Sequence, residues 1–219
     1  MLIRSWEELC SAVDELGFLP LLESGLPGFS VEALTPPENW NGRSDDNPWE
    51  WRFYAVNSGR VVYGRFFRRK AAFVSKEWFP VLANYRRGGY DFDALYDDGL
   101  APYRLMRVMR LFEGGERRTT QEIKAEFSDG KGPDPVLTEL MMRTYLVNAG
   151  FKKRKNRRGE EYGWPVSVYA RPEDVFGGET AHRFYGESPE TSLERLKQRC
   201  AELVPSAGEK QILTFLRGE

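Results

Sequence analysis

The sequence predicts an α+β protein: a winged-helix unit (three helices plus a β-hairpin wing) with a small antiparallel sheet and flanking helices. Three observations predict this class. Apolar residues recur at helical spacing in three successive segments between residues 103 and 148. A hairpin pattern with a basic turn follows at 151–170. Residues 60–74 are rich in Val, Tyr and Phe, which favour strands.

The composition is that of a globular chain. Of its 219 residues, 41% are hydrophobic and 14% aromatic, which excludes wholesale disorder. No apolar run approaches the length of a membrane span, and the first residues lack the order of a signal peptide. Two cysteines and one histidine, His182, argue against a disulfide framework and a His-based metal site. We therefore expect a cytoplasmic protein with no metal and no cofactor.

The net charge of −1 conceals an uneven distribution. We divide the chain at 1–100 (N-terminal helix, irregular segment and sheet), 101–170 (winged-helix unit) and 171–219 (C-terminal helices). The middle region carries 14 Lys and Arg against nine Asp and Glu, whereas both flanking regions are net acidic. The middle region is the first place to expect contact with an acidic partner.

The first region begins with a capping box, Ser5 and Glu8, which predicts a helix that ends at Gly17. Prolines break residues 18–48, where we expect irregular chain with one short turn near Val31–Leu34 and a polar loop over 40–48.

Alternating aromatic residues predict a strand at Trp49–Val56, and strands follow at Arg60–Phe67 and Lys70–Val74. Ser75 is a helix cap, and the helix that it begins should run to about Arg87. Residues 90–99 form an acidic, aromatic connector.

The winged-helix unit starts with a helix at Tyr103–Phe112. A second helix is capped by Thr119 or Thr120, a loop follows at 128–133, and a third helix is expected over Pro135–Asn148, ended by Gly150. Strands at 151–155 and 162–170 then form the hairpin. In the tail, Ser188-Pro189 caps a helix that ends at Pro205, and a last amphipathic helix runs through Phe215.

The first candidate site is the basic tip of the hairpin, where six of seven residues are positive. On a hairpin these charges would project toward the phosphate backbone of duplex DNA, although a solvated tip without a ligand is the competing interpretation. The candidate DNA contacts are Lys152, Lys153, Arg154, Lys155, Arg157 and Arg158, with Arg143 on the third helix. The third helix offers few side chains that read bases, so we expect recognition of shape and backbone.

The second candidate is the acidic connector, with Asp91, Asp93, Asp97 and Asp98. Carboxylates so close together repel, and one of them could act as a general acid or base. Asp91 and Asp93 are the catalytic candidates. A structural turn and a hard-cation site are the two alternatives, and the spacing is not that of an EF-hand loop.

A third candidate is the aromatic run, in which Trp49 and Trp51 would share one face of a strand with Phe53. Exposed rings there could stack on a base, whereas buried rings would belong to the core. Arg65, Arg68, Arg69 and Lys70 form a second basic run that could extend a nucleic-acid footprint, pair with the acidic connector or be solvated.

Four segments resemble a bacterial family described as AlkZ-related. They read SWEELCSAVDELGFLP, GFSVEALTPPENW, SKEWFPVLANYRRGGYDFDALYDDGLA and GEEYGWPVSVYARPEDVFG, and the resemblance covers nearly the whole chain. The family is distantly similar to AlkZ-type enzymes, which are winged-helix DNA glycosylases that remove alkylated or crosslinked bases.

AlkZ-type enzymes carry a catalytic Gln-x-Gln or Gln-x-Asp motif, and this sequence departs from it. Its glutamines are Gln121, Gln198 and Gln211, and none stands two residues from another Gln or an Asp. The resemblance therefore implies the winged-helix architecture more than the reaction.

We accordingly predict a DNA-associated protein of glycosylase-like architecture that binds duplex DNA through its basic wing. If it is an enzyme, the resemblance implies base extrusion, aromatic stacking and a carboxylate that polarises water. The alternatives are a non-catalytic protein-interaction module on a winged-helix scaffold and a small-molecule enzyme that uses the acidic connector. The sequence predicts no membrane partner and does not define an oligomeric state.

Overall fold

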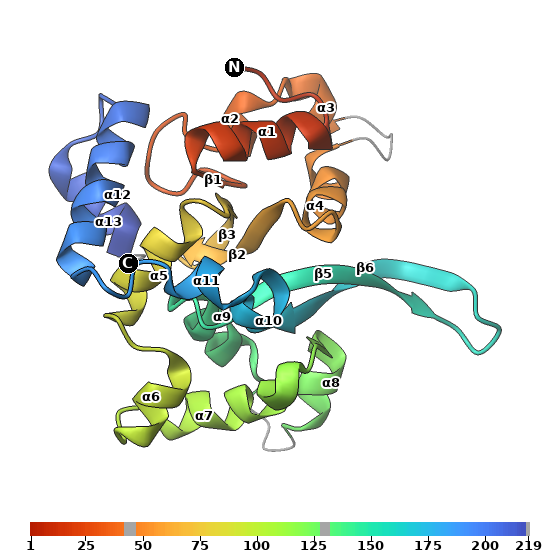
Figure 1. Cartoon of the computed structure of the whole chain (residues 1–219). Helices are drawn as coiled ribbons and strands as arrows, with labels where there is room; N and C mark the ends of the chain where they lie inside the picture. Colours follow the sequence, from red (N-terminus) through yellow and green to blue (C-terminus); the bar gives the residue numbers. More distant parts are fainter. Residues whose placement is uncertain (42–46, 128–131, 218–219) are drawn as a thin grey trace.

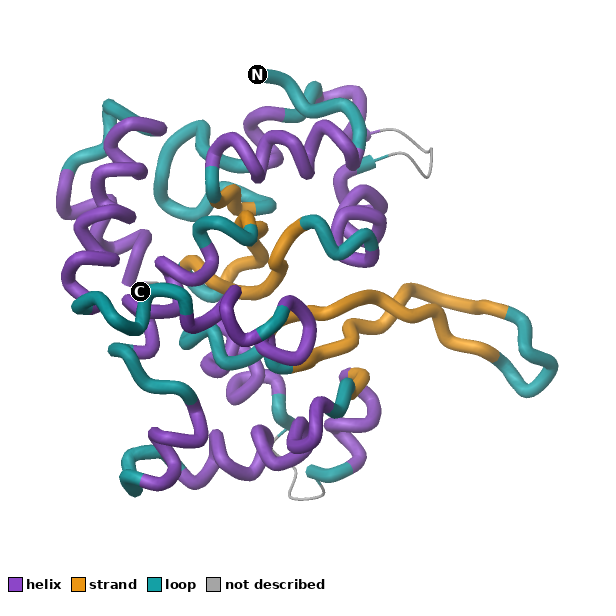
Figure 2. Tube along the Cα trace, viewed as in Figure 1, coloured by secondary structure: helices purple, strands orange, loops and turns teal. Residues whose placement is uncertain are grey.

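A six-stranded antiparallel sheet forms the centre of the molecule. A computed structural model describes residues 1–41, 47–127 and 132–217, and its strand order is β1-β3-β2-β5-β6-β4. The strands are β1 (Phe18–Pro20), β2 (Val61–Phe67), β3 (Lys70–Ser75), β4 (Arg118–Thr119), β5 (Val147–Lys155) and β6 (Glu161–Ala170). Helices surround the sheet, and the β5–β6 hairpin extends well beyond the body (Figures 1 and 2). The predicted α+β class with an antiparallel sheet is confirmed.

The sheet consists of two halves that meet at a narrow seam. Strands β1, β3 and β2 form one half, and β5, β6 and β4 form the other. Among the described residues, a single register pair joins β2 to β5, in which Tyr63 lies opposite Asn148. The two halves therefore diverge on either side of this pair.

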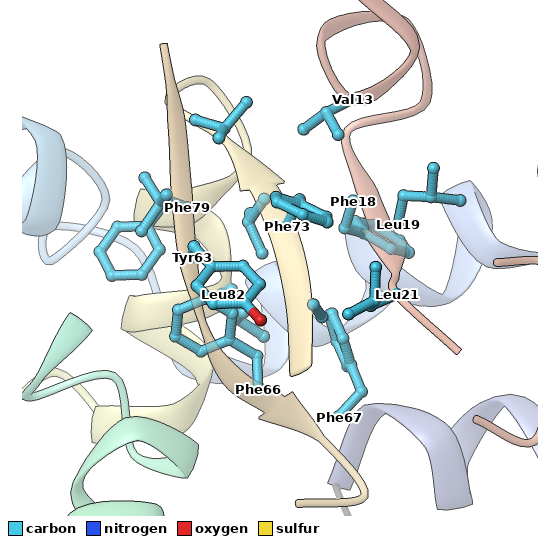
Figure 3. Packing of buried hydrophobic residues seen from close by; sticks show 14 of the residues in the cluster. Val13, Phe18, Leu19, Leu21, Tyr63, Phe66, Phe67, Phe73, Phe79 and Leu82 are labelled. Atoms are coloured by element: carbon cyan, nitrogen blue, oxygen red, sulfur yellow. The ribbon is translucent and has the colours of Figure 1, made fainter. Parts of the chain in front are cut away.

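The first hydrophobic core packs around β1–β3. Phe18, Phe67 and Phe215 lie at its centre, and the rings of Phe67 and Phe215 stack with centroids 4.3 Å apart. Figure 3 shows Phe18 on one side of the strands and Phe79 on the other. The Phe67 ring packs against Phe18, with centroids 5.6 Å apart, and the Phe66 ring against Phe79, with centroids 5.8 Å apart. The helices of this part are α1 (Trp6–Leu16), α2 (Val31–Leu34), α3 (Pro37–Asn41), α4 (Pro48–Asn57), α5 (Phe79–Arg87), α12 (Pro189–Leu203) and α13 (Glu209–Arg217). The core thus joins both ends of the chain.

A second core lies below the hairpin in Figure 1 and is built from residues 92–169. Phe112, Leu137 and Leu140 are buried in it. Its elements are α6 (Phe92–Asp97), α7 (Tyr103–Met109), the 3₁₀ helix η1 (Arg110–Gly115), α8 (Thr120–Ala125) and α9 (Asp134–Met142). The short helices α10 (Pro172–Phe176) and α11 (Gly178–His182) follow β6 and pack against the first core, in which Ala181 is buried.

Several helix starts lie where the caps predict. The Ser5 side chain accepts from the Glu8 amide, and the Ser188 side chain accepts from the Thr191 amide. A complete capping box at Thr119 and Glu122 begins α8. These helix starts can be predicted from sequence because the capping hydroxyl accepts from a backbone amide that has no partner within the helix.

The predicted strand at Trp49–Val56 is wrong, because this segment is helix α4. The Asn47 side chain accepts from the amides of Trp49 and Glu50, and Pro48 occupies the first helical turn. An Asn cap followed by Pro is a helix start of the same kind as Ser188-Pro189. The aromatic alternation obscured this signal. Much of the polar loop expected over 40–48 lies outside the described residues, as do residues 128–131 of the loop expected at 128–133.

Three further boundaries differ from the prediction. The helix expected from Ser75 begins at Phe79, because the Ser75 hydroxyl caps a turn at Trp78 instead. The connector at 90–99 contains α6, with Asp91 as its cap. The third helix ends at Met142 and not near Asn148, because Thr144 adopts a positive φ of 63° and redirects the chain into β5.

Candidate nucleic-acid interface

The outer part of the β5–β6 hairpin, residues 151–166, projects from the body into solvent (Figure 1) and is called the arm below. Its tip is fixed by Asn156, whose side-chain oxygen accepts from the amides of Arg158 and Glu160 at 2.9 and 3.1 Å. Gly159 completes the turn with φ 82°, a conformation that glycine adopts readily. The tip is therefore an ordered turn that presents its side chains outward.

All six predicted basic residues of the arm are exposed. Lys152, Lys153, Arg154 and Lys155 lie on β5, and Arg157 and Arg158 lie on the tip. Lys153 is 3.7 Å from Glu161, and no ion pair joins the other five to a described residue. Only two carboxylates, Glu160 and Glu161, accompany these six cations. The arm is consequently a surface of net positive charge.

Two aromatic side chains on the arm were not recognised as site candidates from the sequence. Trp164 is 71% exposed and Tyr162 is 51% exposed, both on β6. The register slips between the pairs Lys152–Val166 and Arg154–Tyr162, so β6 bulges here, and Gly163 has φ 68°. A bulge re-aims side chains and breaks the alternation of faces. The available signal was the Gly-Trp-Pro sequence, since a glycine inside a strand marks a bulge.

The aromatic candidates on α4 occupy different environments. Trp51 is fully buried in the first core, because a helix turns it away from Trp49. Trp49 is 39% exposed and packs edge-on against Trp40, with ring centroids 5.8 Å apart. The prediction that the two rings share one face is therefore wrong, and the ring of Trp51 does not reach the surface.

Arg143 lies at the end of α9 and not on the arm. Its guanidinium is 3.4 Å from Glu139, which also binds Arg104 at 2.8 Å. Helix α9 has few exposed side chains, because it packs against both α7 and β2. Arg65 of β2 donates to Thr138 at 2.6 Å on one side of the helix. The second basic run thus contributes one arginine to the contact between β2 and α9.

Asp91 and Asp93 line one cavity of about 140 Å³, called the acidic cavity below. The Asp91 carboxylate accepts from the Ala94 amide at 2.7 Å and so caps α6. Asp93 forms an ion pair with Arg171 at 3.1 Å. A second cavity of about 200 Å³ shares Asp93 and Arg171 with it. The predicted carboxylates therefore lie together at a concave surface, although each also has a structural partner.

The structure adds Glu173, Asp174 and His182 to the same cavity. His182 Nε2 lies 3.1 Å from Glu173, which also binds the buried Arg87. Such a carboxylate can fix the orientation of an imidazole. From the sequence, His182 was considered only as an argument against a His-based metal site, because its cavity neighbours come from elements far apart in the chain. Among the described residues, no group of three or more His, Cys, Asp or Glu side chains is arranged to hold a metal ion.

The fold and site define a class of protein: a mixed α+β protein with a projecting basic and aromatic β-hairpin beside an acidic cavity. The chain belongs to the AlkZ-related family, whose profile matches residues 3–217. Comparison with curated proteins gives no match. Comparison with solved structures gives none either. In the described part of the chain, no helix has the length and apolar character needed to span a bilayer.

Proposed function

We propose that this protein binds duplex DNA through the arm, in a DNA glycosylase-like architecture. The observation that carries the proposal is the arm itself, with six exposed cations against two carboxylates and two exposed rings. Cations on a narrow hairpin can follow a phosphate backbone and release its condensed counterions. Trp164 and Tyr162 can stack on bases or wedge between them, as apolar side chains do in minor-groove binders.

The arm is the wing of a winged helix in this proposal. The order α7, β4, α8, α9, β5 and β6 supports it, since three helices precede a hairpin. The pairing of β4 with β6, in which Arg118 lies opposite Tyr169, further supports it by adding a third strand to the hairpin.

The third helix of this unit is not the reading element. Leu137, Thr138, Leu140 and Met141 are buried, and β2 covers the helix from the side of the first core. A helix must present a free face of polar side chains to read base edges in a major groove. Binding is therefore directed at the shape and backbone of the duplex.

The family relationship supports a glycosylase-like role, and the acidic cavity is where base excision would occur. A carboxylate there, Asp91 or Asp93, would polarise water. Base excision is a second proposal, distinct from DNA binding, because the chain lacks the Gln-x-Gln motif of AlkZ-type enzymes. Binding by the arm does not depend on it.

The test is fluorescence-anisotropy binding to a labelled duplex, titrated with salt. The test variant replaces Lys152, Lys153, Arg154 and Lys155 by Ala. A matched control replaces Arg4, Lys76, Lys210 and Arg217 by Ala, four exposed cations outside the arm. We expect the logarithm of the wild-type binding constant to fall with the logarithm of the salt concentration, with a slope of about 0.9 per phosphate contact. The arm variant should lose most of this affinity.

An equal loss in the control variant would mean that net charge, and not the arm, governs binding. No duplex binding by wild type at low salt would contradict the proposal and favour an acidic protein as partner of the arm.

A further inference from the structure

A polar cavity of about 150 Å³ lies at the seam where the two halves of the sheet meet, and it is called the seam cavity below. Tyr63 of β2 and Asn148 of β5, the pair that joins the halves, both line it. Phe151, the first residue of the arm, also lines it. The cavity is separate from the acidic cavity, with Tyr145 and Asp93 in the latter and neither here.

The charged side chains that line the cavity are all positive. Two arginines, Arg52 from α4 and Arg65 from β2, meet in the seam cavity, and no carboxylate of a described residue lines it. The remaining polar lining groups are the Tyr63 and Tyr169 hydroxyls, the Ser167 hydroxyl and the Asn148 amide. Each can donate a hydrogen bond. Two cations without a counter-charge, surrounded by neutral donors, are a combination that favours an anion.

Arg52 is held in place by ring contacts and not by an ion pair. Its guanidinium carbon lies 4.7 Å from the ring centre of Phe53 and 5.1 Å from that of Phe151. Its Nε is buried and has no hydrogen-bond partner. A buried donor without a partner is destabilising, and a bound acceptor would remove that cost.

Arg65 of β2 is the second arginine that lines the cavity. It donates one hydrogen bond, from Nη1 to Thr138 at 2.6 Å, and its other N–H groups have no acceptor among the described residues. Burial raises the pKa of Tyr63, and the charge of Arg52, its hydrogen bond to Tyr63 and the charge of Arg65 oppose this shift. Arg52, Arg65 and Tyr63 all line this one cavity.

We propose that the seam cavity binds a phosphate group between Arg52 and Arg65. The planar guanidinium fork matches phosphate oxygens, and two of them can share one phosphate. Ser167 is placed to supply a neutral donor, because its hydroxyl oxygen already accepts from Asn148 and its own proton remains available. The phosphate belongs either to a DNA backbone held by the arm, which rests on the proposed function, or to a free phosphate or phosphomonoester, which does not.

Methionine methyl NMR gives a readout that is specific to this cavity. Met141 lines the seam cavity, whereas Met106 and Met109 line the cavities beside Asp93 and serve as internal references. The full chain, labelled with ¹³C at the methionine methyls, is titrated with inorganic phosphate at constant ionic strength set by chloride. We expect a saturable shift of the Met141 signal without a matching shift of Met106 and Met109.

The test variant is Arg65→Gln and its matched control is Arg69→Gln. Both arginines are exposed, so neither substitution empties a core, and Arg69 lies outside the cavity. We expect Arg65→Gln to weaken the phosphate affinity reported by Met141 about tenfold or more, because it removes a charge-assisted hydrogen bond. Arg69→Gln should leave this affinity unchanged. Arg52→Gln should weaken it comparably.

A duplex then distinguishes the two sources of phosphate. If duplex DNA displaces phosphate from the seam cavity of wild type, as reported by Met141, but not from that of the arm variant with four alanines, the site binds the DNA backbone. Phosphate binding that duplex leaves intact assigns it to a free phosphate or phosphomonoester, and the result stands even if the arm binds no DNA.

Three results would overturn the proposal. These are no Met141 shift with phosphate, the same shift with chloride alone, and phosphate affinity at Met141 that Arg65→Gln does not reduce more than Arg69→Gln.

Discussion

The Arg87 guanidinium donates two hydrogen bonds to Thr144, from Nε to the side-chain oxygen at 3.1 Å and from Nη2 to the carbonyl oxygen at 2.6 Å. Thr144 has φ 63°, which a β-branched residue rarely adopts. Arg87 also binds Glu173 and Tyr185 and lies 4.8 Å from the ring centre of Tyr145. One buried arginine of α5 therefore stabilises the strained turn that sends the chain from α9 into β5 and the arm.

Replacing Arg87 should destabilise the protein strongly. Its side chain is only 1% exposed. Arg87→Met would remove the arginine from Glu173, which keeps His182, and would leave the Thr144 carbonyl without its Arg87 donor. Breaking a buried pair from one side costs about 3–5 kcal/mol. Urea denaturation should show a loss of this size. Thr144→Gly relieves the positive φ but loses both hydrogen bonds of the Thr144 hydroxyl, one accepted from Arg87 and one donated to the Arg143 carbonyl, so it should cost less stability than Arg87→Met. A loss below about 1 kcal/mol for Arg87→Met would contradict the role given to it.

Trp164→Ala should weaken duplex binding without destabilising the fold. The side chain is 71% exposed, so we expect a change in unfolding free energy within about 0.5 kcal/mol. Loss of one stacked base contact costs about 1–3 kcal/mol of binding free energy. Tyr103→Ala, which removes a 73% exposed ring of α7 outside the arm, is the control for anisotropy and thermal unfolding. Equal affinities of wild type and Trp164→Ala would remove the aromatic part of the proposed interface.

Asp91→Asn separates capping from catalysis. Asn is as good a helix cap as Asp, so α6 should keep its start and the protein its stability. Asp93→Asn breaks the ion pair with Arg171, in which Asp93 is 73% exposed, so its cost should be below about 1 kcal/mol. If wild type releases bases from a damaged duplex, one of these variants should lower the rate about a hundredfold while duplex affinity persists. Unchanged base release in both would exclude the two carboxylates as catalytic groups.

Stability should fall at alkaline pH, in part through Cys200. Burial raises the pKa of this thiol from 9.0 to about 12. The unfolded chain ionises it near pH 9 and the folded chain does not, so its stabilising contribution is complete below pH 9 and is lost as pH rises toward 12. This group alone can lower the unfolding free energy by up to about 1.4 kcal/mol per pH unit in that window. Denaturation from pH 8 to 10.5 should give a shallower decline for Cys200→Ala than for wild type, and identical slopes would contradict the prediction.

The sequence predicted those parts of the fold whose signals are local. A side chain satisfies a backbone amide within three residues at Ser5, Thr119 and Ser188, so these helix starts follow from sequence. The basic turn at 156–159 and the antiparallel class of the sheet are local in the same sense. The Asn47-Pro48 start of α4 was equally local, and the aromatic alternation that followed it outweighed a correct signal.

What the tertiary structure decided depends on groups far apart in the chain. The end of α9 is fixed by Arg87, 57 residues away, and the buried state of Trp51 by the first core. Arg52 and Arg65 line one cavity because α4 and β2 both pack beside β5. By itself the sequence determined the charge of the arm, the helix caps and the family. Which side chains are free to bind a ligand was decided by packing, because burial and charge compensation depend on neighbours that only the folded chain brings together.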